Sequence, residues 1–490
     1  MVFNSYSFLI FFPIVVLILF LFPRKLQHIW LLVASYYFYM NWDARYVLLL
    51  LFSTAVTYLS GIVMDRVRTD GQRKAAVAIS FVLNIGVLFF FKYFNFAVDS
   101  VNIVLRYIGV AIPKPDFNLL LPIGISFYTF QALSYTMDVY RRDITAEWNF
   151  FRYALFVSFF PQLVAGPIER SKNLLGQVNQ PHQFDYDKMR EGLLIMLWGF
   201  FLKLVVADRV AIFVNTVYGD YAQYGGVYII VASVLFAVQI YCDFAGYSTI
   251  AIGAAEIMGF QLMENFDCPY FSLSISEFWR RWHISLSSWF RDYLYIPLGG
   301  NRRGKFIKYR NLMIVFLVSG LWHGAAGTYV VWGLLHGIYQ VIGGITRPLR
   351  DRLNEILELK PESLGHRLVS GLITFGLVDF AWIFFRATSI GDAVSMIKSM
   401  VHIGNINSLI NGGLYELGLN AKNFKVLLLG IVVIIFADYM KYKGIKIREV
   451  IIKQELWCRW LCYIVAFWFI LIFGVWGGNY DASSFIYFQF

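Results

Sequence analysis

Long apolar runs separated by short polar segments dominate the hydrophobicity pattern along this 490-residue chain. Each run has about twenty residues, the length that spans a hydrocarbon core ~30 Å thick. The runs lie at 7–22, 27–42, 46–64, 75–96, 118–138, 151–167, 191–213, 227–258, 312–345, 368–385, 425–440 and 457–476. No repeat or low-complexity linker divides them, so the pattern predicts an all-α polytopic membrane protein with about 11–12 transmembrane helices in a single domain over residues 1–490.

Composition supports this prediction and excludes other classes. With 59% hydrophobic and 15% charged residues and a mean hydropathy of +0.60, the chain is too apolar for a soluble multidomain protein. The first run has no basic residue before it and no small-residue cleavage site after it, so we expect a retained span and not a removable signal peptide. The four cysteines indicate neither a disulfide framework nor a metal site.

Basic residues between the runs predict the orientation of the chain in a cell membrane. The formal charge of +11 favours Lys- and Arg-rich cytoplasmic loops over a nucleic-acid partner. The basic segments are Arg24 with Lys25, and residues 65–74, 141–143 and 441–453. Placing these at the cytoplasm puts the N-terminus outside, and the intervening segments 41–45 and 95–118 are less basic, as this topology requires.

One basic segment is much longer than the other loops. Between Phe271 and Arg310, eight basic residues face two acidic ones, and aromatic residues are interleaved among them, including Trp279, Trp282, Trp289, Tyr293 and Tyr295. This mixture predicts an amphipathic or re-entrant segment at the cytoplasmic face, with its aromatic side in the membrane and its basic side toward headgroups or an anionic ligand. A plain interfacial helix without a ligand is an equal alternative.

Two histidines lie in a charge-free stretch, Asn311 to Thr346, that is too long for one ordinary span. We expect two spans joined near 324–328, which places His323 roughly 18 Å from Asn311 and far from the cytoplasmic face. Burial disfavours the charged imidazolium, so His323 is expected to be neutral and able to act as a general base. Trp322 and Gly324 flank it, and the glycine allows close approach of a ligand or another backbone. His336, thirteen residues on, is interpreted as structural.

Two further buried or interfacial groups are candidates. His283 lies in the basic aromatic segment and is either a simple interfacial histidine or a second site residue facing His323. Asp243 lies within an apolar run, so it is expected to face a cavity or to be paired, and a structural role is favoured over that of a catalytic acid.

Several blocks of the chain resemble the membrane-bound O-acyltransferases, within them the branch of alginate O-acetyltransferases and teichoic-acid D-alanyl transfer proteins. The blocks are LLPIGISFYTFQALSYTMDVYR at 120–141, FFPQLVAGPIER at 159–170, YCDFAGYSTIAIGAAEIMGF at 241–260, residues 264–304 with WRRWHISLSSWFRDYLYIPLGG, and SGLWHG at 319–324. The resemblance implies a ring of helices around a thin centre with funnels to both faces. It also implies that His323 is catalytic and that His283 is a supporting site residue.

The resemblance also implies the reactants. A cytoplasmic acyl thioester, acetyl-coenzyme A, would be the donor substrate, and no tightly bound cofactor is expected. Its phosphates would be held by basic side chains, with these candidates: Arg280, Arg281, Arg302, Arg303 and Lys305. An exported or cell-surface polysaccharide would be acetylated, directly or through a separate extracytoplasmic partner that carries the acyl group.

Two alternatives stay open. D-alanine delivered by a carrier protein could replace acetyl as the transferred group, although the length of the chain, PLGGNRRG and the ending SSFIYFQF favour the alginate-type branch. A transporter or lipid flippase is the alternative of another class, and the absence of an internal repeat argues against it.

Overall fold

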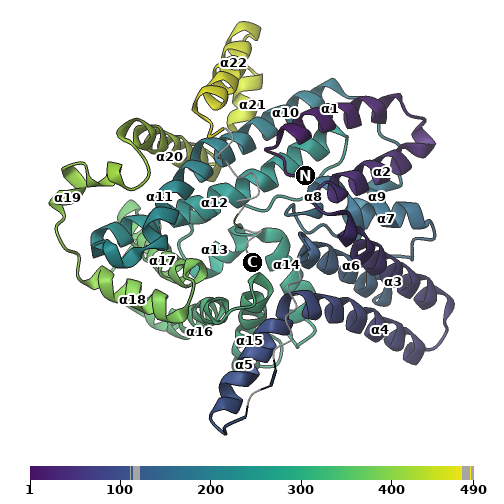
Figure 1. The fold of residues 1–490 in the computed structure, drawn as a ribbon, viewed down its shortest axis with the longest axis horizontal. Helices are drawn as coiled ribbons and strands as arrows, with labels where there is room; N and C mark the ends of the chain where they lie inside the picture. Colours follow the sequence, from purple (N-terminus) through teal and green to yellow (C-terminus); the bar gives the residue numbers. More distant parts are fainter. Residues whose placement is uncertain (111, 114–121, 477–485, 487–490) are drawn as a thin grey trace. The chain divides into compact units, whose positions relative to one another are not determined.

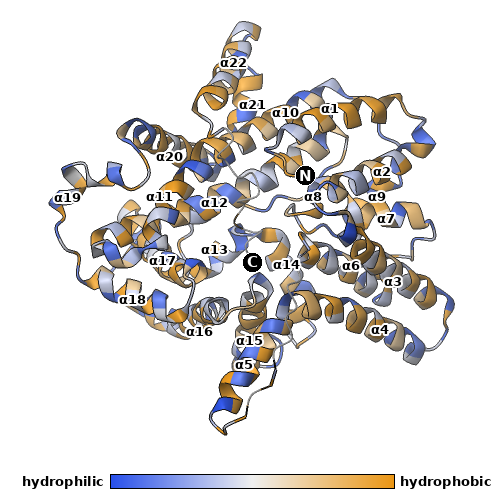
Figure 2. Cartoon of the chain, viewed as in Figure 1, coloured by the Kyte–Doolittle hydropathy of each residue, from blue (hydrophilic) through white to orange (hydrophobic). Residues whose placement is uncertain are grey.

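The computed structural model describes residues 1–110, 112–113, 122–476 and 486. Every regular element among these residues is a helix, so the predicted all-α fold is confirmed for the described chain. Six helices are long and apolar enough to cross a membrane, and hydrophobic residues recur along them (Figure 2). The first residues of the predicted span 118–138 lie outside the described residues, as does the ending 483–490 apart from residue 486.

The described chain divides into two compact units, the first holding residues 1–196 and 250–263. Its helices are α1 (Tyr6–Leu21), α2 (Gln27–Met40), α3 (Val47–Arg66), α4 (Asp70–Leu88), α5 (Phe94–Arg106), α6 (Ile125–Tyr140), α7 (Phe150–Ser158), α8 (Phe160–Leu163), α9 (Ser171–Val178) and most of α10 (Tyr186–Phe200). Only Met137 and Tyr140 of α6 are not buried, so protein surrounds this helix on nearly all sides.

The predicted span 151–167 does not form one continuous helix. Helix α7 ends at Ser158, because Phe159 has an extended ψ of 112°, and α8 contributes a single turn before an irregular segment begins. Gly166 folds this segment back tightly, since a Cβ there would lie 2.3 Å from Cα of Gln162. The side chains from Ala154 to Ile168 are buried, so protein covers the apolar run within this unit.

The second unit holds residues 197–249 and 264–489. Its helices are α11 (Asp208–Gly219), most of α12 (Gly226–Ile257), α13 (Ile275–Arg281), α14 (Ile284–Phe290), α15 (Lys305–His323), α16 (Gly327–Ile356), α17 (Leu364–Arg386), α18 (Ile390–Val401), α19 (Asn407–Ile410), α20 (Ala421–Tyr442), α21 (Ile447–Ile452) and α22 (Leu456–Phe473). A π-helical stretch, Phe201–Ala207, links α10 to α11.

Helices α15 and α16 form the hairpin predicted for the charge-free stretch (Figure 1). Their backbones approach closely at two glycines. A Cβ at Gly320 would lie 2.3 Å from the carbonyl oxygen of Tyr329, and a Cβ at Gly333 would lie 2.3 Å from that of Phe316. Small residues at such a crossing let membrane helices pack backbone to backbone. The glycines therefore fix the end of α15, where His323 lies.

The basic aromatic segment 271–310 is not a flat interfacial helix. It folds into α13, α14, a π-helical turn over Arg291–Tyr295 and a series of turns. Its tryptophans Trp279, Trp282 and Trp289 are buried in protein, where the sequence had suggested membrane contact. The re-entrant course of the segment and the membrane face at which it lies stay predictions.

Candidate active site

His323 is the last residue of α15 and is 3% exposed. Aromatic rings from three helices enclose its imidazole. Ring centroids lie 4.9 Å away for Trp322, 4.9 Å for Trp332 of α16 and 5.4 Å for Phe385 of α17. With 19 residues in α15, His323 is about 27 Å along the helix axis from Lys305. The helix thus carries the imidazole away from the basic turn that precedes it, as the sequence predicted.

Gly324 has a specific steric role beside His323. It is extended (φ −166°, ψ 153°) and ends the helix. A Cβ at this position would lie 2.1 Å from Cε2 of Tyr329, so any other residue would displace that ring. Tyr329 in turn packs edge to face on Phe385, with centroids 5.1 Å apart. The glycine after the histidine therefore lets Tyr329 and Phe385 close one side of the site.

His283 lies beside His323 although 40 residues separate them in the sequence. It immediately precedes α14, is fully buried and has a left-handed φ of 44°. Its ring centroid is 6.4 Å from that of His323 and 5.9 Å from that of Trp322. Phe244 of α12 packs against its other side at 4.7 Å. The structure thus brings together the two histidines that the sequence singled out.

His336 lies one layer away and has a different environment. It is fully buried, and its Nδ1 accepts a hydrogen bond of 3.2 Å from the indole N–H of Trp279. Trp332 contacts both histidines of the hairpin, at 5.1 Å from His336 and 4.9 Å from His323. This geometry fits the structural role expected for His336, which helps to hold Trp332 against the catalytic candidate.

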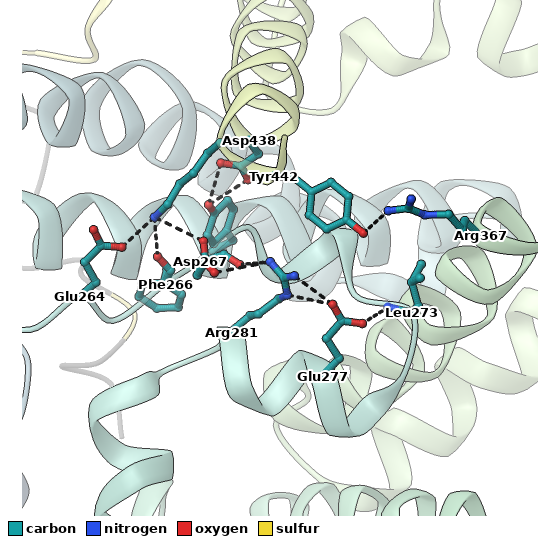
Figure 3. A network of polar contacts seen from close by, with 11 residues as sticks. Glu264, Phe266, Asp267, Leu273, Glu277, Arg281, Arg367, Asp438 and Tyr442 are labelled. Atoms are coloured by element: carbon teal, nitrogen blue, oxygen red, sulfur yellow. Dashed lines mark hydrogen bonds and ion pairs between the residues drawn. The ribbon is translucent and has the colours of Figure 1, made fainter. Parts of the chain in front are cut away.

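The five basic candidates divide into two groups. Arg280, Arg302, Arg303 and Lys305 are exposed, and no ion pair joins them to the residues that the structure describes. Arg281 is instead half-buried in a polar network (Figure 3). Its guanidinium pairs with Glu277 at 3.0 Å, approaches Asp267 at 3.5 Å and lies over the ring of Tyr442. Arg281 is therefore less available to a ligand than the other four.

Asp243 is paired, as expected for an acid within an apolar run. Its Oδ1 lies 2.6 Å from Nζ of Lys203, and Nζ is also 2.8 Å from Asp208. Its Oδ2 accepts a hydrogen bond from the backbone N–H of Ile486. These contacts fit a structural role for Asp243.

Sequence inspection missed three neighbours of the histidines. Trp332 and Phe385 come from helices whose packing could not be deduced from their own residues. Asn265 contacts His283 and lies in the block beginning ENFDCPY, so its presence in that block was the available indication. Short local motifs identified the histidines, whereas their enclosing shell depends on tertiary packing.

Two buried histidines with ring centroids 6.4 Å apart, in an all-helical chain with six helices apolar enough to cross a membrane, are the arrangement that the sequence led us to expect of a membrane-bound O-acyltransferase. Comparison with known proteins agrees, since the model of the membrane-bound O-acyltransferase family matches residues 134–354, which include both histidines. The chain belongs to this family and is an O-acyltransferase.

Three relatives illustrate which proteins the chain is similar to in sequence. The chain is 40% identical to the probable alginate O-acetylase AlgI of Pseudomonas aeruginosa over 410 residues, covering 82% of this chain and 75% of that protein. It is 34% identical to a peptidoglycan O-acetyltransferase of Helicobacter pylori over 417 residues, covering 79% and 75%. It is 28% identical to a teichoic acid D-alanyltransferase of Bacillus subtilis over 289 residues, covering 55% and 70%.

Proposed function

We propose that this chain transfers an acetyl group from cytoplasmic acetyl-coenzyme A across the cell membrane for O-acetylation of an exported or cell-surface polysaccharide. The observation that carries the proposal is the pair His323 and His283, with rings 6.4 Å apart in a shell of aromatic side chains. Membership of an enzyme family favours this function over the transporter considered from the sequence.

His323 is the general base in this proposal. It takes the proton of an acceptor hydroxyl while the hydroxyl oxygen attacks the thioester carbonyl. The C–S bond then breaks, and the proton passes from His323 to the departing thiolate, so that an ester and a free thiol are formed. The surrounding rings from Trp322, Trp332 and Phe385 exclude water, which would otherwise compete as the nucleophile.

The donor is held at the other end of α15. Arg302, Arg303 and Lys305 are exposed there and carry the charge that coenzyme A phosphates require. Arg280 is also exposed, while the engagement of Arg281 by Glu277 makes it a structural cation in the proposal. The thioester arm would then extend along the α15–α16 hairpin toward His323.

The proposed acyl group and acceptor are argued from the relatives. The two with the longer alignments are an alginate O-acetylase and a peptidoglycan O-acetyltransferase, which favours acetyl as the acyl group and a glycan as the final acceptor. The D-alanyltransferase relative is less similar and aligned over 55% of this chain. We further propose that a separate extracytoplasmic acyl-carrying or acyltransferase partner receives the group, and that the N-terminus is extracytoplasmic.

The substitution His323→Ala tests the proposal. It removes the base but leaves the exposed donor site, so acetyl transfer should fall by roughly 10²–10⁴-fold. Acetyl-coenzyme A binding and thermal stability should stay near wild type. The measurements are the O-acetyl content of the surface glycan in cells that produce the chain, and calorimetry on the purified protein.

His336→Ala is the matched control from the same charge-free stretch. It removes the partner of the Trp279 indole and so should lower stability, while the folded protein keeps most of its activity. Near-normal acetylation by His323→Ala would refute the mechanism. Calorimetry without any acetyl-coenzyme A binding to intact wild-type protein would refute the donor and favour a carrier protein.

A further inference from the structure

The side-chain amide of Asn265 contacts His283 and two other groups in the interior of the second unit. Its Oδ1 accepts a hydrogen bond of 3.2 Å from the backbone N–H of Ser285 and lies 3.4 Å from Nδ1 of His283. Its Nδ2 donates to Oγ of Ser248 on α12 at 3.1 Å. Asn265 and Ser248 are each 1% exposed. The amide is therefore held between α12 and the start of α14.

These partners determine which atoms of the amide face which groups. A backbone N–H can only donate, so the amide atom facing Ser285 must be the oxygen. The same oxygen faces Nδ1 of His283, and two acceptors cannot share a hydrogen bond. We assign the proton to Nδ1 because only then is this contact a hydrogen bond, and this assignment leaves the lone pair of the neutral imidazole on Nε2.

Asn265 also forms a hydrogen bond with the backbone next to His283. Its carbonyl oxygen accepts a 3.0 Å hydrogen bond from the N–H of Ile284, the residue after His283. His283 itself has a left-handed φ of 44°, which residues other than glycine seldom adopt. Asn265 thus contacts His283 itself through its side chain, and the two residues that follow His283 through its own carbonyl and side chain. It therefore restrains both the position and the tautomer of the ring.

We propose that Asn265, supported by Ser248, is a positioning residue that keeps His283 in the Nδ1–H tautomer and presents Nε2 as a hydrogen-bond acceptor for an O–H or N–H group of the reactants. The inference rests on the proposed function for its role in acyl transfer. The assignment of the tautomer rests on hydrogen-bond geometry alone. The 3.4 Å contact is long, as hydrogen bonds of catalytic groups often are before substrate binds.

A purely structural alternative makes a different prediction. If Asn265 only capped α14 through Ser285, its loss would lower stability without changing the protonation of His283. If Asn265 positions His283, its loss would release the ring to both neutral tautomers. The two roles are therefore separated by a spectroscopic measurement of the ring nitrogens together with the rate of transfer.

The experiment uses the full chain in lipid nanodiscs with ¹⁵N-labelled histidine, and His283→Asn assigns the resonances. Wild-type protein should show a protonated Nδ1 and an unprotonated Nε2 at His283. Asn265→Leu should give a mixture of tautomers and a rate at least about tenfold lower, as loss of an orienting partner of a functional histidine typically does. Asn265→Asp should rescue both properties, because a carboxylate still accepts from Nδ1–H and Ser285, while the Ser248 hydroxyl can turn to donate.

The proposed tautomer can be tested even if a variant fails to fold. A wild-type His283 with its proton on Nε2 would overturn it, whatever the variants do. Folded Asn265→Leu with an unchanged tautomer and a wild-type rate would also overturn it. Because the tautomer is measured without substrate, wild-type protein that is inactive with acetyl-coenzyme A would refute the proposed function without affecting the tautomer assignment.

Discussion

The second unit buries ionisable side chains in two regions that differ in how polar groups are satisfied. At Lys203, the ammonium lies 2.8 Å from Asp208 and 2.6 Å from Asp243, and all three side chains are 4% exposed. At His323 and His283 the neighbours are mainly aromatic rings. One region pairs opposite charges, whereas the other surrounds two titratable rings with apolar surface.

The difference indicates what each region does. A buried cation is tolerated because carboxylates compensate it, and such a group has little freedom to exchange protons with a substrate. A neutral imidazole needs no countercharge, so it can be buried next to reactants and still accept a proton. We therefore assign the carboxylate cluster to the scaffold around the π-helical stretch Phe201–Ala207, and the histidines to the proposed chemistry.

The largest expected effect on stability tests the scaffold region. Lys203→Met removes the ammonium that pairs with both Asp208 and Asp243 and leaves two close carboxylates in a buried site. Breaking a buried ion pair in this way typically costs 3–5 kcal/mol, so we expect a loss of about that size in the free energy of unfolding. Thermal and denaturant unfolding in detergent micelles measure it.

An exposed lysine provides the control. Lys172 is 3.2 Å from Asp143, with side chains 54% and 39% exposed, and Lys172→Met should cost about 1 kcal/mol or less. If Lys203→Met were as stable as Lys172→Met but lost acyl transfer, the carboxylate cluster would be part of the chemistry and the contrast between the two regions would fail.

A smaller effect tests the packing around the histidines. Gly324→Ala would place a methyl group 2.1 Å from the ring of Tyr329, which must then move away from Phe385. Overpacking of this kind typically costs about 1–3 kcal/mol, so we expect a modest loss of stability and a larger loss of acetyl transfer. The transfer rate per folded molecule is the decisive measurement.

Gly343→Ala is the matched control, since a Cβ at that position of α16 would meet nothing within 4 Å beyond its chain neighbours and the nearby backbone of its own helix. It should be neutral or slightly stabilising, because alanine favours a helix. Equal transfer rates for the two alanine variants would show that Tyr329 does not shape the site.

The same contrast explains which features the sequence revealed. Apolar runs of spanning length predicted most of the long helices, because membrane burial demands them. The break between α15 and α16 was predicted because the uncharged stretch exceeds one span and contains glycines. The break of the helix at Phe159 within 151–167 could not be predicted, because burial in protein and burial in lipid select the same side chains.

The site was predictable only in part for a related reason. His323 and His283 stand out because a titratable residue in an apolar or basic aromatic context is unusual. Their partners Trp332, Phe385 and Asn265 have ordinary types and ordinary local contexts, so nothing in their own segments indicates that they meet. Arg281 resembled its basic neighbours in sequence, and only the fold shows that Glu277 engages it.

The smallest expected effect concerns the exposed basic residues at the start of α15. Reversing the charge of Arg302 and Arg303 together should weaken acetyl-coenzyme A binding by roughly three- to tenfold, because exposed ionic contacts are individually weak. Screening should reduce wild-type affinity as salt rises and should reduce the difference between wild type and variant. Calorimetry at two salt concentrations measures both, and thermal stability should not change.

Lys360→Glu changes charge in an exposed loop between α16 and α17 and controls for the overall charge of the protein. If it weakened binding as much per charge as the arginine reversal does, the donor would sense the general positive field and not a site at α15.

Arg281→Gln should instead lower stability with little effect on affinity, because it breaks the pairs with Glu277 and Asp267. A selective loss of donor binding in that variant would place the donor site in the network around Arg281 and not at the exposed turn. Charged side chains would then bind a reactant, which contradicts the division into a charged scaffold and an aromatic site.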